Sequence, residues 1–115
     1  MFTDDELDAL FHALAHAIRR RILDVLRDRP GLAVGALAQE FDVSRIAIMN
    51  HLRVLQDANL VLSEKHGRSR KLYLNATPIQ MIHERWTNEY SATFANRVLS
   101  IKAIAEAAAS EDQDP

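Results

Sequence analysis

The fold is decided by residues 34–74, which read VGALAQEFDVSRIAIMNHLRVLQDANLVLSEKHGRSRKLYL. The spacing of apolar residues predicts a short helix over Val34–Phe41, followed by a turn at Asp42-Val43. Ser44 is a favoured N-cap residue, and it predicts a second helix from there to about Ala58. Two helices joined by so short a turn predict a helix-turn-helix.

A β-hairpin is predicted directly after the second helix. Its strand-like runs cover Leu60–Lys65 and Ser69–Leu74, and Gly67 between them supplies the positive φ that a tight turn needs. Long cations gather near the tip of this hairpin. A helix-turn-helix followed by a basic hairpin is the order of a winged helix-turn-helix, so double-stranded DNA is the first partner to consider.

Two helices are predicted before this stretch. Thr3 and Glu6 form a capping-box pattern, so a first helix is expected over about residues 4–15. A second helix is expected over His16–Arg27, with three arginines, Arg19–Arg21, at its start. Three cations oppose the helix dipole there. Two explanations stay open, namely a solvated face, or contacts with acids of the first helix or with the DNA backbone.

A long last helix is predicted over residues 78–109, because Pro78 suits a first helical turn and apolar residues then recur every three or four positions. About 30 residues at about 1.5 Å each would extend roughly 45 Å, more than a domain of this size covers with its own core. We therefore expect a homodimer through the first and last helices, the alternative being a bent or two-part helix folded onto its own domain. The expected interface consists of Leu7, Leu10, Phe11, Trp86, Tyr90, Phe94, Val98 and Ile101.

The expected fold class is mainly α with a small β-hairpin wing, in the order α-α-α-α-β-β-α. Residues 1–109 are expected to form one domain, with dimerisation helices at about 4–15 and 78–109. The acidic residues 110–115 are expected to be a disordered tail.

Charge is unevenly distributed along the chain. The formal net charge is −2, yet residues 44–74 hold six cations and two anions. The rest of the chain therefore carries −6. A positive face on an acidic protein still attracts phosphate.

Composition argues against several classes. The chain has no cysteine, which excludes disulfides and thiolate metal sites. No apolar run approaches the roughly 20 residues of a membrane helix and the N-terminal sequence is acidic, so a cytoplasmic protein without a membrane partner is expected. No catalytic motif appears, and an enzyme is not expected. His12, His16 and His83 are weak metal candidates without further ligands, so neither a metal nor another cofactor is expected.

The residues expected to contact DNA follow from a helix lying in the major groove. Arg45 suits a guanine and Asn50 an adenine, while Ile46 and Met49 suit thymine methyl groups. His51 is expected to reach a phosphate or to orient a neighbour. The complete expected set is Ser44, Arg45, Ile46, Met49, Asn50, His51 and Arg53 on the helix, and Lys65, Arg68, Arg70 and Lys71 on the hairpin. The alternatives are a solvated helix face and a charged hairpin that discourages strand pairing.

Three segments carry a family resemblance: FHALAHAIRRRILDVL (11–26), SRIAIMNHLRVLQDANLV (44–61) and GRSRKLYLN (67–75). Over about residues 10–75 the chain resembles the ArsR/SmtB family of bacterial and archaeal transcriptional regulators. The last helix is similar to that of a subgroup with an aromatic dimerising last helix, here without cysteine. The resemblance implies a homodimeric repressor that binds a palindromic operator near promoters.

The chain departs from the family pattern at several positions. His16-Ala17 stands where an Asp-Pro pair is common, and Ala33 stands where the third helix usually begins on Ser or Thr. The third-helix cysteine pair of many metal sensors is absent. The predicted recognition helix carries Arg45, Ile46 and Met49-Asn50 where other side chains are common, so a different operator sequence is expected.

The main hypothesis is a sequence-specific DNA-binding transcriptional regulator. The alternative is a winged-helix module that docks a protein and has no specific DNA binding. The effector stays open: a small apolar or aromatic molecule near the last helix, or none, with protein concentration setting repression.

Overall fold

The computed structural model describes residues 2–87 and 89–112, of which 89–94 and 110–112 are described by their backbone alone. The chain forms two compact units, Met1–Pro78 and Ile79–Pro115. No described helix is both long and apolar enough to cross a membrane.

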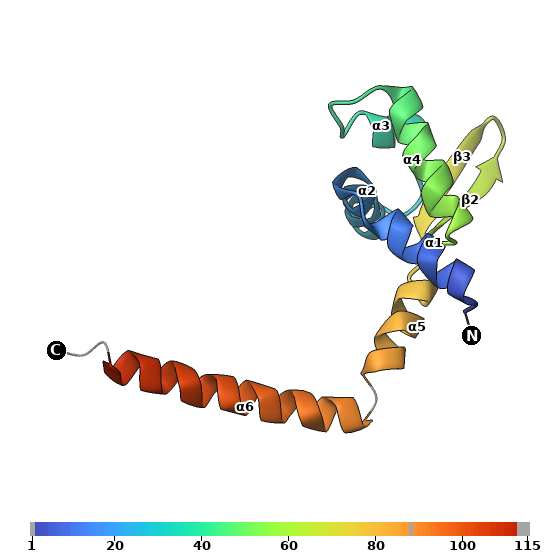
Figure 1. Ribbon diagram of the computed structural model, residues 1–115. Helices are drawn as coiled ribbons and strands as arrows, with labels where there is room; N and C mark the ends of the chain where they lie inside the picture. Colours follow the sequence, from blue (N-terminus) through green and yellow to red (C-terminus); the bar gives the residue numbers. More distant parts are fainter. Residues whose placement is uncertain (1, 88, 113–115) are drawn as a thin grey trace. The chain divides into compact units, whose positions relative to one another are not determined.

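The first unit contains the helix-turn-helix and the wing (Figure 1). Aliphatic side chains from four helices and from the bases of the two hairpin strands meet in its core, among them Leu10, Ile22, Leu26, Leu37, Ile48, Leu55 and Leu72. Its elements are α1 (Asp4–Leu14), α2 (Ala17–Asp28), β1 (Leu32–Ala33), α3 (Val34–Ala38), α4 (Arg45–Asp57), β2 (Val61–His66) and β3 (Ser69–Leu74).

Strand β1 is an element that the sequence did not predict. It makes the sheet three-stranded and antiparallel, in the order β1-β3-β2, with Leu32 opposite Leu72. Gly31 precedes it with φ +86° and donates its N–H to the carbonyl of Leu72 at 2.8 Å. The strand has two residues and follows a proline-glycine pair, so no periodic pattern marks it. Its pairing makes β3 the central strand and anchors the base of the wing to the domain.

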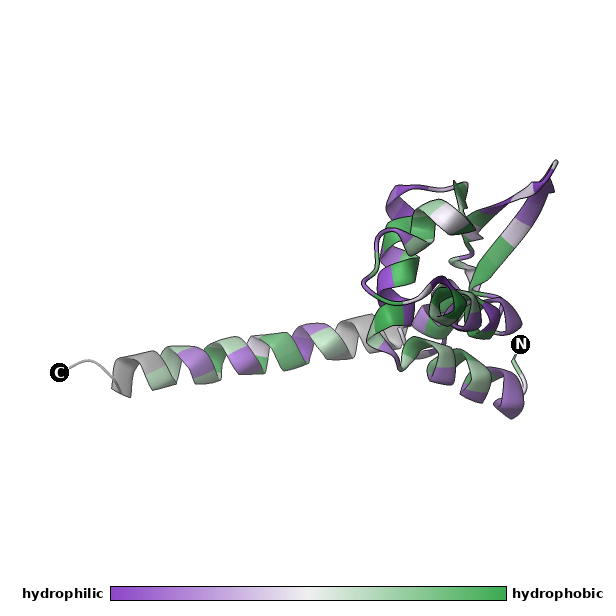
Figure 2. Cartoon of the chain, turned by 90° about the horizontal axis from the view of Figure 1, so that it is seen from above, coloured by the Kyte–Doolittle hydropathy of each residue, from purple (hydrophilic) through white to green (hydrophobic). Residues whose placement is uncertain are grey.

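The hairpin forms as predicted. Gly67 has φ +61° and, with Arg68, joins His66 to its cross-strand partner Ser69 in a two-residue turn. Figure 2 shows that the base of the hairpin is hydrophobic and the tip hydrophilic. The base is buried through Val61 and Leu72, whereas the tip is exposed.

The C-terminal part forms two helices, α5 (Thr77–Trp86) and α6 (Glu89–Asp112). The prediction of one continuous helix over 78–109 is therefore wrong, and the two-part alternative describes the break. The Thr87 hydroxyl donates to the carbonyl of His83, four residues earlier, at the end of α5. Helix α6 also extends three residues beyond Ala109, into the segment expected to be disordered, while 113–115 lie outside the described residues.

Candidate nucleic-acid interface

Helix α4 presents the expected face to solvent. The Ser44 hydroxyl accepts the N–H of Ala47 at 3.1 Å and so caps the helix, as predicted. Steps of three and four residues then turn Ile48, Leu52 and Leu55 into the core. The opposite face is exposed and consists of Arg45, Ile46, Met49, Asn50 and Arg53.

Two large apolar side chains stand out on this face. Ile46 is 72% exposed and Met49 is 50% exposed. Adjacent exposed apolar side chains among polar ones are typical of a surface that a partner covers. The face therefore combines apolar contact area with two guanidinium groups and a carboxamide, which is the chemistry that distinguishes base edges in a major groove.

The cations of the wing fall on two different faces. Register pairs Lys65 with Arg70 and Glu64 with Lys71. Because side chains alternate along a strand, Arg70 shares its face with the buried Leu72, while Lys71 lies on the other face with Glu64. The first face therefore continues the core side of the sheet and carries cations alone, whereas the second face mixes charges.

A cleft of about 350 Å³ separates α4 from the wing. Arg45 and Met49 of α4 line one side, and Arg68 and Arg70 of the wing line the other. The start of α3 forms one end of the cleft. There Arg45 Nη1 lies 3.9 Å from the position that the Cβ of a larger residue would occupy in place of Gly35. The cleft is lined by three guanidinium-bearing side chains and by no acid.

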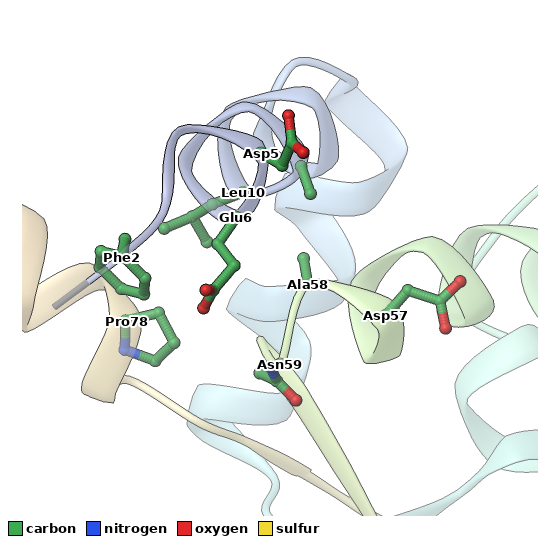
Figure 3. A pocket seen from close by; sticks show the side chains of 9 residues that line it. Phe2, Asp5, Glu6, Leu10, Asp57, Ala58, Asn59 and Pro78 are labelled. Carbon is green, nitrogen blue, oxygen red and sulfur yellow. The ribbon is translucent and has the colours of Figure 1, made fainter.

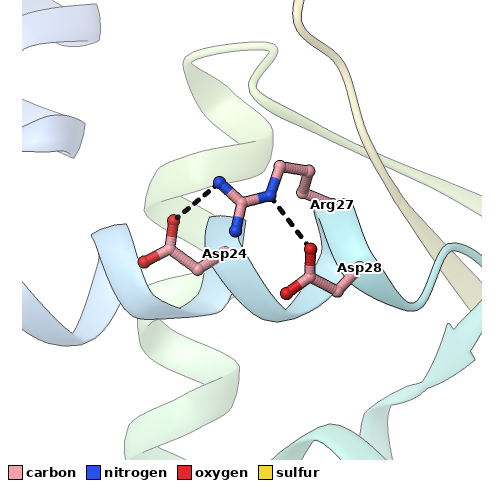
Figure 4. Close-up of polar contacts among 3 residues, drawn as sticks. All are labelled: Asp24, Arg27 and Asp28. Carbon is pink, nitrogen blue, oxygen red and sulfur yellow. Dashed lines mark hydrogen bonds and ion pairs between the residues drawn. The ribbon is translucent and has the colours of Figure 1, made fainter.

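Other arginines are already paired with carboxylates. Arg27 lies 3.0 Å from Asp28 and 3.8 Å from Asp24 (Figure 4). The hydrogen bond to Asp28, together with the charges of both acids, raises the pKa of Arg27. In the described part of the chain, by contrast, no ion pair engages the cations of α4 or of the wing apart from a His66–Glu64 contact. Those cations remain available to phosphate.

The arginine cluster of α2 makes contacts that the sequence did not suggest. Arg19 is buried and donates to the carbonyls of Ala13 at 2.8 Å and His12 at 2.9 Å. Arg20 donates to the carbonyl of Leu14 at 2.8 Å. These carbonyls belong to the last turn of α1, where a helix leaves its carbonyls without the usual i+4 backbone donors. The carbonyl of His12 also accepts the N–H of Ala15 at 3.1 Å. Two arginines thus cap one helix from the start of the next.

Arg21, the third arginine, reaches the loop after α3. Its Nη2 donates to the carbonyl of Glu40 at 3.3 Å, and its guanidinium lies 5.1 Å from the centroid of the Phe41 ring. No member of the cluster pairs with an acid of α1, so that part of the prediction is wrong. Arg20 and Arg21 are exposed, as a solvated face requires, and contact with the DNA backbone stays a prediction.

His51 is half-buried and lies on the inner side of α4, not with the exposed residues around it. Its Nδ1 is 3.2 Å from Arg19 Nη1, and its ring centroid lies 4.5 Å from that of His16. A guanidinium only donates, so Nδ1 must accept and the ring must be neutral. Burial, then the charges of His16 and Arg19, lower the pKa of His51. Of its two expected roles, orientation of a neighbour agrees with this placement better than a phosphate contact.

His16 is a structural residue that the sequence analysis missed. It is the N-cap of α2, and its Nδ1 accepts the N–H of Ile18 at 3.1 Å. Histidine is not among the usual capping residues, so the residue type gave no signal of this cap. In the described residues, no three His, Asp or Glu side chains gather as a metal site, and this includes His12 and His16.

A hollow of about 260 Å³ lies at the start of α1, beside Ala58 and Pro78 (Figure 3). Asp5 and Asp57 contribute to its rim, but their carboxylates point away from it in Figure 3. Pockets for drug-sized ligands usually span about 300–1,000 Å³. The hollow gives no support to an effector site in this unit.

The residues expected at a dimer interface are not equally accessible. Leu10 is 1% exposed and belongs to the core, so its assignment to an interface is wrong. Phe11 is 44% exposed, and Trp86, Val98 and Ile101 are also exposed. Leu7 is half-buried. The side chains of Tyr90 and Phe94 lie outside what the structure describes.

Comparison with known proteins agrees with this geometry. A family model for a helix-turn-helix domain matches residues 14–64. The chain is 38% identical over 85 residues to the uncharacterized HTH-type transcriptional regulator YuzN of Bacillus subtilis, which covers 69% of this chain and 92% of YuzN. An ArsR-like transcriptional regulator from Rhodococcus sp. RHA1 has a similar structure, with a TM-score of 0.68, 33% identity, and coverage of 90% of this chain and 93% of that one. The chain belongs to the ArsR family of winged helix-turn-helix regulators.

The protein is thus a DNA-binding transcriptional regulator, as the sequence resemblance implied. A further relative is the transcriptional repressor SdpR of Bacillus subtilis, 30% identical over 74 residues, which make up 64% of this chain and 81% of SdpR. The alternative of a protein-docking module without DNA binding is set aside by this membership. The family is one of transcriptional regulators, not of enzymes.

Proposed function

We propose that the protein is a homodimeric repressor acting in the cytoplasm, and that each subunit places α4 in a major groove of a palindromic operator. The observation that carries the proposal is the exposed face of α4, where two apolar side chains stand among polar ones that read base edges. Similarity to the repressor SdpR supports repression of transcription and not activation.

Within this proposal the residues of α4 divide by chemistry. Asn50 pairs with an adenine edge, Arg53 contacts a guanine or the backbone beside it, and Ile46 packs on thymine methyl groups. Ser44 contributes a phosphate contact next to its cap. The wing contributes Lys65, Arg68, Arg70 and Lys71 to the electrostatic attraction of the duplex.

The dimer is supported by the surface of α6. Val98, Leu99, Ile101 and Ile104 are all exposed in a single chain, with Ile101 at 66% and Ile104 at 70%. Aliphatic side chains this exposed on one helix are costly in water. A second copy of the chain, joined also through the exposed Phe11 of α1, covers them and sets the distance between two α4 helices.

The test is selection of bound sequences from a random pool of duplex DNA by the full chain. We expect an inverted repeat whose half-sites are centred about one helical turn, roughly 34 Å, apart. Binding of the wild-type chain to any duplex should also weaken steeply as salt rises. If the chain shows no salt-dependent binding to DNA, α4 does not read DNA. If selection enriches a single half-site, the protein does not bind its operator as a dimer.

A further inference from the structure

We propose that Arg19 and His51 together position α4 for operator recognition, and that the contact between them requires a neutral His51. Mild acid then reduces the preference of the protein for its operator over other DNA. The inference rests on the proposed placement of α4 in a major groove. It makes both residues positioning residues, which act on the DNA-facing side chains from inside the protein.

Arg19 connects α1 to α4 through its guanidinium group. Its Nε donates to the carbonyl of Ala13 at 2.8 Å, and its Nη2 donates to the carbonyl of His12 at 2.9 Å. Its Nη1 lies 3.2 Å from Nδ1 of His51 on α4. Arg19 is only 8% exposed, so water does not readily replace these partners. Because the guanidinium is planar and rigid, a shift of α4 relative to α1 would misalign at least one of the three hydrogen bonds.

His51 brings this contact next to the proposed base-reading residues. It directly follows Asn50 and stands two residues before Arg53. Successive side chains of an α-helix project about 100° apart, so His51 turns inward while Asn50 is exposed. A pair of hydrogen bonds to a base edge tolerates little misalignment. The inner contact of His51 therefore fixes the direction in which the outer face of α4 points.

The groups around His51 disfavour a positive charge on its ring. Burial lowers the pKa of His51, and the charges of His16 and Arg19, both at the start of α2, lower it further. From α1 come the carbonyls of His12 and Ala13, which Arg19 already occupies. Among the described residues, no carboxylate forms an ion pair with His51. A proton on Nδ1 would remove the acceptor of Arg19 and place two cations side by side.

A phosphate contact by His51 would give the opposite dependence on pH. A histidine that binds a phosphate attracts it more strongly when the ring is protonated, so affinity for any duplex would rise in acid. A neutral acceptor for Arg19 is lost in acid, so discrimination between sequences falls. The sign of the pH effect therefore separates the two roles.

The test compares operator preference at two pH values. The probes are the duplex that the wild-type chain enriches from a random pool at about pH 7.5, and a random-sequence duplex of the same length. Preference is the ratio of the two association constants, in which phosphate contacts common to both duplexes cancel. For the wild type we expect this ratio to fall about tenfold between about pH 7.5 and about pH 5. The fall follows the sign of the shift, because neutral His51 is lost as the pH drops through its lowered pKa.

Two variants separate the acceptor from the titrating group. His51→Gln keeps an oxygen that accepts from Arg19 but does not titrate, so its ratio should change much less with pH. His51→Leu has neither property, so its ratio should be lower than that of His51→Gln at about pH 7.5 and should also change little. His83→Gln is the matched control, because it removes an exposed histidine of α5 away from the reading face. Its ratio should follow that of the wild type.

Three results would overturn the inference. Equal falls of the ratio in the wild type and in His51→Gln would show that another group titrates. Equally low ratios for His51→Gln and His51→Leu at about pH 7.5 would show that the acceptor has no role. A wild-type affinity that rises in acid for both duplexes, and does not rise in His51→Gln, would identify a phosphate contact.

Circular dichroism of the same samples separates positioning from stability. The wild-type ratio should fall at a pH where the helix content is still native. A ratio that falls only together with the helix content would reduce the effect to unfolding and would also contradict the inference.

Failure of the proposed function has a different signature. If the wild-type chain enriches no sequence and shows no salt-dependent binding, the DNA-reading role of α4 fails, and the positioning role fails with it. If the chain enriches a sequence and its preference is indifferent to pH, only the role of the contact between Arg19 and His51 fails.

Discussion

His51 joins the inner side of the DNA-facing helix to the start of α2. Its Nδ1 accepts from Arg19, its ring packs against His16, and both neighbours disfavour a positive charge on it. A protonated imidazole has no lone pair for the guanidinium and would place two cations side by side. The orientation of α4 therefore depends on a neutral His51.

Stability should consequently fall in mild acid. Because the pKa of His51 is lowered on folding, the unfolded chain binds a proton below about pH 6.5 while the folded chain does not. The contribution of neutral His51 is complete above that pH and is lost as the pH falls through the lowered value. We expect the free energy of unfolding in urea to drop more for the wild type than for His51→Gln between about pH 7.5 and about pH 5.5. Parallel curves for the two proteins would show that His51 is not the titrating group.

At the scale of elements, α2 stabilises α1 through side chains that donate to backbone carbonyls. Arg19 makes two such hydrogen bonds in a buried position, and Arg20 makes one in an exposed position. Removing a buried donor leaves the carbonyls that it bound without a hydrogen bond, which costs free energy. An exposed carbonyl that loses its donor can accept a hydrogen bond from water instead.

The two arginines should therefore differ sharply when truncated. Arg19→Ala should lower the free energy of unfolding by about 3 kcal/mol, and Arg20→Ala by about 1 kcal/mol or less. Urea unfolding followed by circular dichroism measures both, and Arg20→Ala is the control for removing one of three adjacent charges. If both substitutions lower the free energy of unfolding equally, the hydrogen bonds of Arg19 to the carbonyls of α1 are not what stabilises the contact between α1 and α2.

The same elements show how far the sequence could be interpreted. The core positions of α4 and the glycine of the wing were predictable, because apolar spacing and positive φ each leave a residue pattern. The partners of Arg19 and Arg20 were not, because backbone carbonyls are present in every sequence. The break before α6 was hidden by an apolar stripe that continues across it, although Thr87 offered a signal through its low helix propensity. The direction of Arg45 depends on the space beside Gly35, which only the packed structure shows.

At the scale of the whole molecule, the proposed dimer depends on the aliphatic flank of α6. Val98, Ile101 and Ile104 follow one another in steps of three and so lie on one side of the helix. Burying one such side chain stabilises by about 1.5–3 kcal/mol, and a symmetric dimer buries each residue twice.

Ile101→Glu should accordingly weaken the dimer about 100-fold or more in its dissociation constant. Sedimentation over a range of protein concentrations would measure this change. Ala103→Glu is the matched control, because it adds the same charge to α6 at an exposed position on the opposite side of the helix from Ile101. Equal effects of both substitutions would point to charge alone, and an unchanged mass for Ile101→Glu would place the subunit contact elsewhere.

The turn at the tip of the wing has a consequence for how the protein can be altered. A Cβ built on Gly67 meets nothing within 4 Å, whereas the base of the hairpin is tied to the core through Leu72 and to a third strand. Residues inserted symmetrically at the tip would lengthen the hairpin by about 3.4 Å per pair without disturbing any packed side chain. The length of the hairpin can therefore change independently of the hydrophobic core. Evolution or protein design could use such changes to alter the length of duplex that the protein covers.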